Sequence, residues 1–280
     1  MILSDAIRAA GWKPPQNIHT GKISRFSTGE KGNDWNGWVY PFPDGEGASF
    51  GCWRTGEVHT WQLRRDKPLS KAELTELRRK AEQAKQQAEI EREQRHQQAA
   101  IEAVQIVKDA KPAPEKHGYL IRKQIQPHNL AMDSQGRLIV TIYDQNGQLV
   151  NIQRISADGT KRFLSGGKIK GCFSVVGNWR NSETLMIAEG IATTISLHQH
   201  TGFCCIAALS ASNLKAVAEY WHSRCPDKKI ILAGDNDLSG VGQESATKAA
   251  LAVNGLLIVP PKAGMDFNDW LNSGGVICKT

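Results

Sequence analysis

Carboxylates follow two apolar, β-prone runs in the C-terminal part of the chain, at the points where these runs end. Glu189 follows the run 184–188, and Asp235 and Asp237 end the run that starts at 229. Helix-forming sequence resumes soon after each run, so we expect parallel strands that bring these acids to one edge of a sheet. The carboxyl ends of parallel strands are where open α/β sheets hold ligands.

Two further acids, Asp266 and Asp269, lie in the segment 264–270. If the strands are neighbours, all five carboxylates reach the same edge. Clustered carboxylates raise each other's pKa unless a cation neutralises them. Their hard oxygens favour Mg2+ or Mn2+, which substrate phosphates also bind. The pattern therefore predicts metal-assisted phosphate chemistry. A helix-capping role for Asp235 and Asp237 is the alternative for each residue taken alone.

The elements that must position these acids alternate between strand and helix from residue 182 onward. We expect strands near 184–188, 203–208, 229–234 and 256–259, with helices near 191–199, 213–224 and 241–253. This order predicts a parallel, Rossmann-like α/β sheet with right-handed crossovers.

The preceding segment, residues 115–170, is basic and β-rich. It carries nine Lys and Arg against four Asp and Glu, whereas residues 180–280 carry eight against nine. Runs of alternating apolar residues flank Asn146-Gly147, which predicts a hairpin. We expect this basic α+β segment to face the acids and bind phosphates. The candidate nucleotide- and template-binding residues are Arg154, Lys161, Arg162, Lys168 and Lys170.

Residues 1–66 are rich in Gly and aromatic residues, which predicts a short helix over 2–10 followed by a small antiparallel sheet. Its rings alternate with basic residues, as in surfaces that stack single-stranded DNA. The alternative is that the rings form the core of a small β module. The candidate stacking residues are Trp35, Trp38, Trp53 and Trp61.

We expect residues 67–112 to form a long helical linker, because Gly is absent and Ser70 and Glu73 form a capping-box pattern. Pro112 ends it. We expect its last turns, with Ile101, Val104 and Val107, to pack on the segment that follows.

The bulk composition limits the class of protein. The chain has 280 residues, a formal charge of +7 and a pI near 9.1, which suit a polyanionic partner. Its six cysteines include no Cys-x-x-Cys pair, so we expect free thiols and no zinc site. No run has the length of a membrane span, and the N-terminus is too polar for a signal peptide. We therefore expect a cytoplasmic protein without membrane association.

Four motifs together resemble the Toprim domain of DnaG-type primases, in the version found on phages and plasmids. They are Glu189-Gly190, residues 208–214, Asp235-Asn236-Asp237-x-x-Gly240 and Asp266-Phe267-Asn268-Asp269. With the upstream basic segment, the resemblance covers about residues 115–272. It implies that Glu189 is an acid-base or metal-organising carboxylate. It makes Asp235 and Asp237 metal ligands, with Asp266 and Asp269 as outer members of the cluster. Asn236 stands where replicative primases usually have Gly.

This resemblance implies template-directed synthesis of RNA primers by two-metal nucleotidyl transfer. Single-stranded DNA, ribonucleoside triphosphates and Mg2+ or Mn2+ are the expected partners and cofactors. Two departures stand out: the N-terminal module has only Cys52 where such primases carry a zinc ribbon, and the chain ends soon after Trp270. We therefore expect dependence on a separate replicative helicase.

The same acids leave two other functions open, a Toprim nuclease and a non-catalytic protein that binds single-stranded DNA. A topoisomerase is disfavoured because no Tyr lies in a suitable setting. The domains expected are 1–66 as an N-terminal β module, 67–112 as a linker, 113–179 as the basic subdomain and 180–280 as the Toprim domain.

Overall fold

The computed structural model describes residues 2–29, 35–63, 70–238 and 240–277. It contains two compact units, Met1–Ala81 and Glu82–Thr280, and each is described by itself. The expected boundary between residues 66 and 67 lies outside the described residues.

The first unit is a four-stranded antiparallel sheet with one helix. The helix α1 (Leu3–Ala9) packs on the strands β1 (Ser24–Phe26), β2 (Gly37–Pro41), β3 (Gly47–Cys52) and β4 (Val58–Gln62), which pair in sequence order. Ile7, Phe26 and Phe50 are buried between the helix and one face of the sheet. The predicted helix and small antiparallel sheet are therefore confirmed.

The helix α2 (Lys71–Asp109) begins at the predicted capping box. The Ser70 backbone N–H donates to the Glu73 carboxylate at 2.8 Å, and the Glu73 N–H donates to the Ser70 hydroxyl at 3.3 Å. These bonds satisfy backbone groups that a helix start leaves without partners.

The C-terminal turns of α2 pack on the following sheet through small side chains. Ala99 and Ala103 are buried with Ile139 and Ile152 of that sheet, and Val107 packs against the same cluster as expected. The expectation for two residues was wrong: Ile101 is 66% exposed and Val104 is 52% exposed. Both lie off the stripe that Ala99, Ala103 and Val107 mark at helical spacing, so they face solvent.

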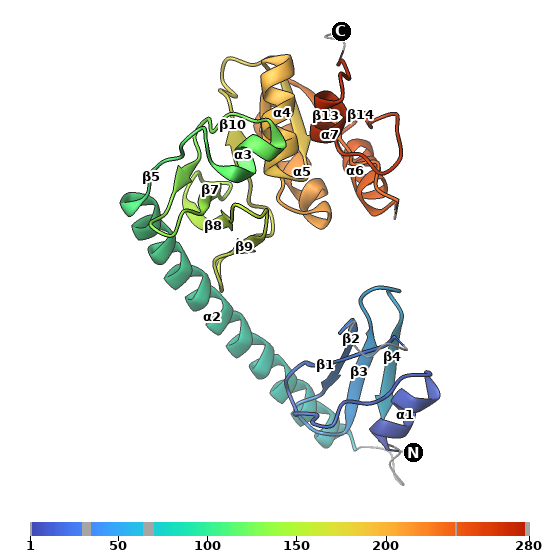
Figure 1. Ribbon diagram of the computed structural model, residues 1–280. Helices are drawn as coiled ribbons and strands as arrows, with labels where there is room; N and C mark the ends of the chain where they lie inside the picture. Colours follow the sequence, from blue (N-terminus) through green and yellow to red (C-terminus); the bar gives the residue numbers. More distant parts are fainter. Residues whose placement is uncertain (1, 30–34, 64–69, 239, 278–280) are drawn as a thin grey trace. The chain divides into compact units, whose positions relative to one another are not determined.

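The basic segment forms a five-stranded antiparallel sheet beside α2 (Figure 1). Its strands, in spatial order, are β5 (Lys111–Pro112), β6 (Ala131–Met132), β7 (Leu138–Tyr143), β8 (Leu149–Ile155) and β9 (Lys161–Phe163), with the helix α3 (Gly118–Lys123) between β5 and β6 in sequence. The predicted hairpin is β7–β8. Gly147 takes the positive φ of 78° that its turn requires, and the Asp144 carboxylate accepts two backbone N–H bonds within the turn.

The C-terminal sheet has the predicted β-α alternation. In spatial order its strands are β10 (Ser174–Val176), β12 (Cys204–Ala207), β11 (Thr184–Ala188), β13 (Lys229–Ala233) and β14 (Leu256–Ile258). The last four strands are parallel, which confirms the prediction, and β10 adds an antiparallel edge that the sequence did not predict. β10 precedes residue 180, where we expected the Toprim domain to start.

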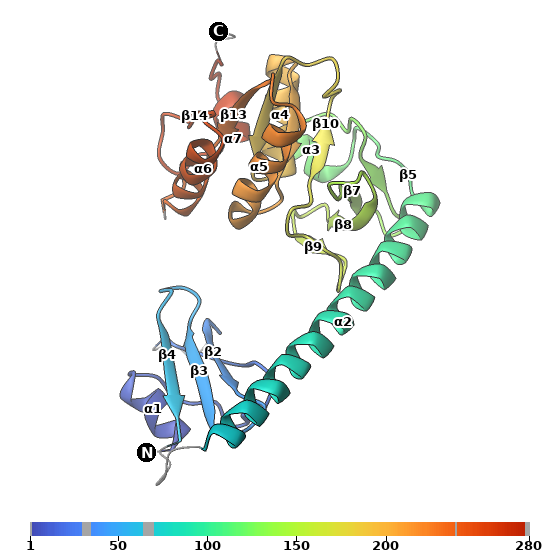
Figure 2. The same cartoon turned by 180° about the vertical axis from the view of Figure 1, so that it is seen from behind.

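Helices cover both faces of this sheet. The helices are α4 (Ile191–Thr201), α5 (Leu214–Arg224, after a 3-10 turn at Ala211–Asn213), α6 (Val241–Ala252) and α7 (Phe267–Asn272). Leu185 and Ile187 of β11 point to α5 and α6, which lie side by side (Figure 2), whereas Met186 and Ala188 face residues of α4 and α7. A strand buried on both faces is apolar throughout, as this one is.

The two sheets of this unit share a core. Leu138 and Val140 of β7 are buried together with Ile191 and Ile195 of α4. The basic segment and the C-terminal sheet are thereby held in a fixed relation to each other. In the described residues no helix is long and apolar enough to span a membrane.

The packing of α2 can be tested with one substitution at each of two alanines. Ala103→Asp buries an unpaired carboxylate where Ala103 is fully buried, whereas Ala84→Asp lies on the exposed part of the same helix. Both substitutions have the same helix-propensity cost, so the difference between their effects on the free energy of unfolding reports the burial of Ala103. We expect Ala103→Asp to lower the free energy of unfolding by about 3 kcal/mol more than Ala84→Asp, measured by urea denaturation. Equal effects would mean that α2 does not pack there.

A candidate active site at the carboxyl ends of the parallel strands

The central acids follow two neighbouring strands, β11 and β13. Ala188 of β11 lies opposite Ala233 of β13 in a parallel pair, so Glu189 and Asp235 follow at the same edge of the sheet. The loop that precedes α7 lies beside the same edge, because the Asn236 N–H donates to the Met265 carbonyl at 3.0 Å. Asp266, the next residue, is therefore brought close to Asp235.

The acids interact strongly. Burial raises the pKa of Asp235 to about 7, and the negative charges of Asp266, Glu189 and Asp237 add to the increase. Burial also raises the pKa of Glu189, which Asp237 raises further and a backbone N–H of Ala211 lowers. The Asp235 Oδ1 is buried without a hydrogen-bond partner among the described residues.

Two lysines of the basic segment face these acids. Burial lowers the pKa of the Lys161 amine and the nearby Lys123 lowers it further, while Asp266, Glu189 and Asp235 oppose this change. Lys123 binds Asp266 at 3.8 Å and Asp269 at 3.1 Å. Burial alone would lower the pKa of Lys123, but these two acids raise it above its ordinary value.

Two buried asparagines fix the backbone around the cluster. The Asn213 amide donates to the carbonyls of Ile169, Cys172 and Ala208, and its oxygen accepts the Gly171 N–H at 2.7 Å. These bonds hold the loop before β10 against the segment after β12.

Asn268 of α7 is the second buried asparagine that fixes the backbone around the acids. It is fully buried and donates to the Lys123 carbonyl and to the Ser196 hydroxyl, both at 2.7 Å. Asn272 donates to the same Lys123 carbonyl at 3.0 Å. The helix α7 is thus bound to α3 through the carbonyl and the amine of Lys123, and to α4 through the Ser196 hydroxyl.

The predicted acids are not equivalent. Besides burial, Asp266, Glu189 and Asp237 raise the pKa of Asp235, whereas the half-exposed side chain of Asp269 pairs with Lys123. Asp266 also caps α7, since its carboxylate accepts the Asp269 N–H at 2.8 Å. In the described part of the chain, no three Asp, Glu, His or Cys side chains are already arranged as ligands of one metal ion. The metal-binding roles stay predictions.

The five predicted basic residues divide in a similar way. Lys161 on β9 reaches the acids. Arg154 on β8 is partly buried and lies 3.8 Å from Asp133, so its charge is partly balanced inside the sheet. Arg162, Lys168 and Lys170 are exposed, as residues that bind a phosphate backbone must be.

Sequence reasoning missed Lys123 and Tyr119 of α3 as site residues. Tyr119 is buried, its hydroxyl has no hydrogen-bond partner in the described residues, and its ring lies 5.9 Å from the Lys161 amine. Neither residue is near the acids in sequence: Lys123 and Asp269 are separated by 146 positions. Only the packing of α3 against α7 could identify them.

The four tryptophans of the N-terminal unit lie in different settings. Trp38 and Trp53 stack with ring centroids 6.1 Å apart, and the Arg25 guanidinium lies 5.0 Å from the Trp53 ring. Trp35 is 56% exposed, and its carbonyl accepts two bonds from Arg25. Trp61 instead packs against the core.

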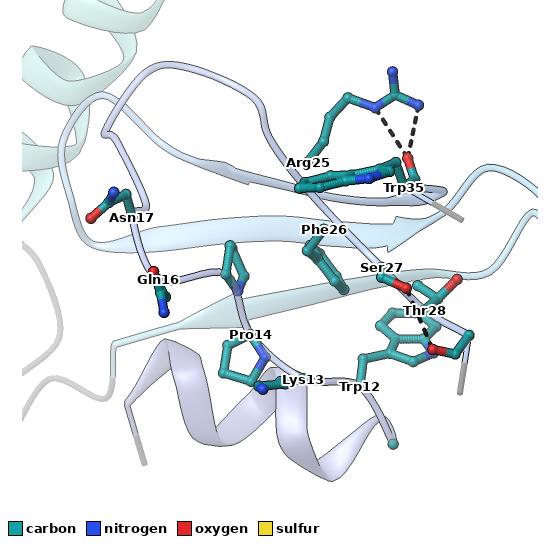
Figure 3. A pocket seen from close by; sticks show the side chains of 13 residues that line it. Trp12, Lys13, Pro14, Gln16, Asn17, Arg25, Phe26, Ser27, Thr28 and Trp35 are labelled. Atoms are coloured by element: carbon teal, nitrogen blue, oxygen red, sulfur yellow. Dashed lines mark hydrogen bonds between the residues drawn. The ribbon is translucent and has the colours of Figure 1, made fainter. Parts of the chain in front are cut away.

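A pocket of about 800 Å³ lies next to this group. Figure 3 shows Arg25 and Trp35 together, across strand β1 from Phe26 and Trp12. Arg25, Trp38 and Trp53 therefore form an aromatic and basic surface, whereas Trp61 belongs to the opposite, core-facing side of the sheet.

The ionisation of Asp235 gives a pH-dependent prediction. Its folded-state pKa of about 7 lies above the ordinary value of 3.8. Protonated Asp235 therefore contributes stability fully below about pH 3.8, and this is lost as the pH rises through 7. In EDTA, Asp235→Asn should raise the free energy of unfolding by about 2 kcal/mol more at pH 8 than at pH 5.

Urea denaturation at the two pH values measures this difference. Asp227→Asn, at an exposed acid, is the control and should show no such pH dependence. A gain for Asp235→Asn that is equal at both pH values would contradict the repulsion within the cluster.

Comparison with known proteins shows what the sequence around this site resembles. Residues 184–276 match the family model of the Toprim domain. Two proteins of Escherichia coli, both named DNA primase TraC, are 33% identical to the chain. One match spans 258 residues, with 87% of this chain and 24% of the relative, and the other spans 219 residues, with 74% and 15%. The chain thus spans less than a quarter of the length of these relatives.

Solved primase structures are also similar to the chain. The primase fragment of the bacteriophage T7 primase-helicase matches with a TM-score of 0.44 and 18% identity, over 57% of this chain and 70% of that one. The zinc-binding and RNA polymerase domains of the Aquifex aeolicus primase match with a TM-score of 0.44 and 12% identity, over 97% and 80%. On the sequence matches, residues 184–276 form a Toprim domain, and the chain is homologous over most of its length to the DNA primases TraC.

Proposed function

We propose that this chain carries the catalytic site of a DNA primase, which joins ribonucleotides into short RNA primers on a single-stranded DNA template. The observation that carries the proposal is the set of mutually repelling carboxylates, Glu189, Asp235, Asp237 and Asp266, beside the Lys161 amine within a Toprim domain. Sequence similarity to proteins named DNA primase supports the same activity.

The donor set fits a divalent cation. The Asp235 Oδ1 has no hydrogen-bond partner among the described residues, and burial together with the neighbouring acids raises the pKa of this carboxyl. Oxygen ligands of this kind suit Mg2+ or Mn2+. Glu189, Asp235 and Asp237 would hold the metal, with Asp266 and Asp269 as outer members. When bound, the metal supplies positive charge for the phosphate oxygens of the nucleotide.

The residues of this chain hold the substrate for in-line attack. The 3′-hydroxyl of one ribonucleotide attacks the α-phosphate of the next, and pyrophosphate leaves. Lys161, which interacts with the acids, would neutralise a phosphate next to them, while the exposed Arg162, Lys168 and Lys170 would hold the template or the triphosphate. Arg154, whose Nε lies 3.8 Å from the Asp133 carboxylate, would offer a weaker phosphate contact.

The partners follow from this activity. They are single-stranded DNA, ribonucleoside triphosphates and a replicative helicase that exposes the template. The aromatic and basic surface of Arg25, Trp38 and Trp53 would stack unpaired template bases, in place of a zinc ribbon.

One assay separates the candidate activities. The chain is incubated with single-stranded DNA, labelled ribonucleotides and Mg2+ or Mn2+, and the products are separated by size. Short RNA oligomers would support the primase, a shortened template would indicate a nuclease, and a mobility shift without either product would indicate a binding protein. The last two results contradict the proposal.

The acids should be essential for this synthesis. We expect Asp235→Asn and Asp237→Asn each to lower the rate of primer synthesis by about 10²- to 10³-fold, because charge stabilisation at the reacting phosphate is lost. Asp227→Asn changes an exposed acid of the same domain and should leave the rate within twofold. Wild-type rates in the Asp235→Asn variant would exclude the cluster as the catalytic site.

The N-terminal surface gives a separate prediction. Trp53→Ala should weaken binding to oligothymidylate about tenfold, since stacking on an aromatic ring contributes about 1–3 kcal/mol per base. Trp61→Ala removes a ring on the core side, so it should lower the thermal stability of the first unit. Fluorescence anisotropy and circular dichroism measure the two effects. If the Trp53→Ala variant keeps the wild-type affinity for oligothymidylate, this surface does not stack template bases.

A further inference from the structure

A second pocket lies at the edge strand β10, and none of its lining residues belongs to the acidic cluster. It has a volume of about 350 Å³. Its aromatic walls come from Phe173, Trp179, Tyr220 and Trp221, whose rings contact one another with centroids 5.1–5.6 Å apart. The turn of the β7–β8 hairpin closes one side, where the Tyr220 hydroxyl donates to the Gln145 carbonyl at 2.8 Å.

Two guanidiniums line the same pocket. The Arg180 guanidinium lies 4.4 Å from the centre of the Trp179 ring, and that of Arg224 lies 5.2 Å from it. Neither forms an ion pair with an acid in the described part of the chain. The lining acid is Asp144, whose carboxylate already accepts backbone N–H bonds of the turn. A guanidinium stacked on a ring keeps its N–H edge available, and its fork matches the oxygens of a phosphate.

One buried donor in the wall has no acceptor. Trp221 is 3% exposed, and its indole N–H has no hydrogen-bond partner among the described residues. A buried donor without an acceptor costs free energy, which a ligand with a ring nitrogen or carbonyl oxygen would recover. The amide of Asn146, exposed at the rim, offers a donor and an acceptor to the same ligand.

We propose that this pocket binds one nucleotide unit, a planar base with its phosphate, at a site separate from the acidic cluster. The aromatic walls take the base, Arg180 and Arg224 take the phosphate, and the Trp221 N–H donates to the base or sugar. The volume is at the lower end of the range of about 300–1,000 Å³ for ligand pockets, so it suits a single ring-bearing unit.

Two kinds of ligand carry a base with its phosphate: a free nucleotide and an unpaired nucleotide within a single strand. An acidic peptide with an aromatic side chain is disfavoured, because the amide at the rim suits the polar edge of a base better than a hydrocarbon ring. The proposal does not depend on the function proposed above. Its test omits the metal that the acidic cluster would need.

The experiment measures binding to the whole chain in EDTA. Titration calorimetry with AMP tests the free nucleotide, and fluorescence anisotropy with labelled oligothymidylate tests the strand. We expect Arg180→Ala and Arg224→Ala each to weaken AMP binding about tenfold, the usual loss for a charge-assisted contact. Trp221→Phe, which keeps a ring but removes the N–H, should weaken it about threefold.

Two variants serve as matched controls. Lys215→Ala removes an exposed cation from the same helix α5, and Lys116→Ala removes one from the basic segment. Both should keep the AMP affinity of the wild type. If Arg180→Ala and Arg224→Ala weaken oligothymidylate binding as well, the site accepts a nucleotide within a strand, and if they weaken AMP binding alone, it accepts the free nucleotide.

Three results would overturn the proposal. The first is wild-type affinity for both probes in Arg180→Ala and Arg224→Ala. The second is the absence of any AMP or oligothymidylate binding in the wild type. The third is arginine-dependent binding of an Asp-Asp-Phe peptide without binding of either nucleotide probe. The two arginines are exposed, so their replacement should leave the fold intact even if Trp221→Phe does not fold.

Discussion

Repulsion among partly buried carboxylates is the constraint around which the second unit is built. Parallel pairing of β11 with β13 forces Glu189 and Asp235 to one edge, and the loop before α7 adds Asp266. Burial there favours the neutral acids, as the raised pKa of Asp235 shows. A fold optimised for stability alone would not gather these charges, and carboxyl groups with pKa values raised in this way are typical of functional sites.

The fold offsets this repulsion with contacts at the periphery. Lys123 pairs with Asp266 and Asp269, and the buried Asn268 binds the Lys123 carbonyl. These contacts join α3 of the basic segment to α7 of the Toprim domain. The core shared by β7 and α4 then keeps Lys161 beside the acids. The basic and acidic parts of the chain therefore act as one body, although their charge compositions differ.

In the described part of this unit, several buried polar groups have no hydrogen-bond partner, among them the Arg154 Nε and the Asn268 Oδ1. Asp235 Oδ1 and the Tyr119 hydroxyl lie at the acidic edge, and the Trp221 indole lies in the pocket beside β10. Most buried polar groups in proteins are hydrogen-bonded. Both regions combine such groups with cations of the basic segment or of α5, and Lys and Arg side chains form strong hydrogen bonds with phosphate oxygens.

The sequence by itself determined the elements and the central acids. Local signals suffice for these features: the apolar runs that end at Glu189 and Asp235, the Asn-Gly turn and the capping box at Ser70. Tertiary packing alone decided which distant residues join them. Lys123 reaches the site because α3 packs on α7, and Ile101 faces solvent because smaller side chains of α2 fit the sheet. Periodicity reports which residues share a face, but it does not report what that face meets.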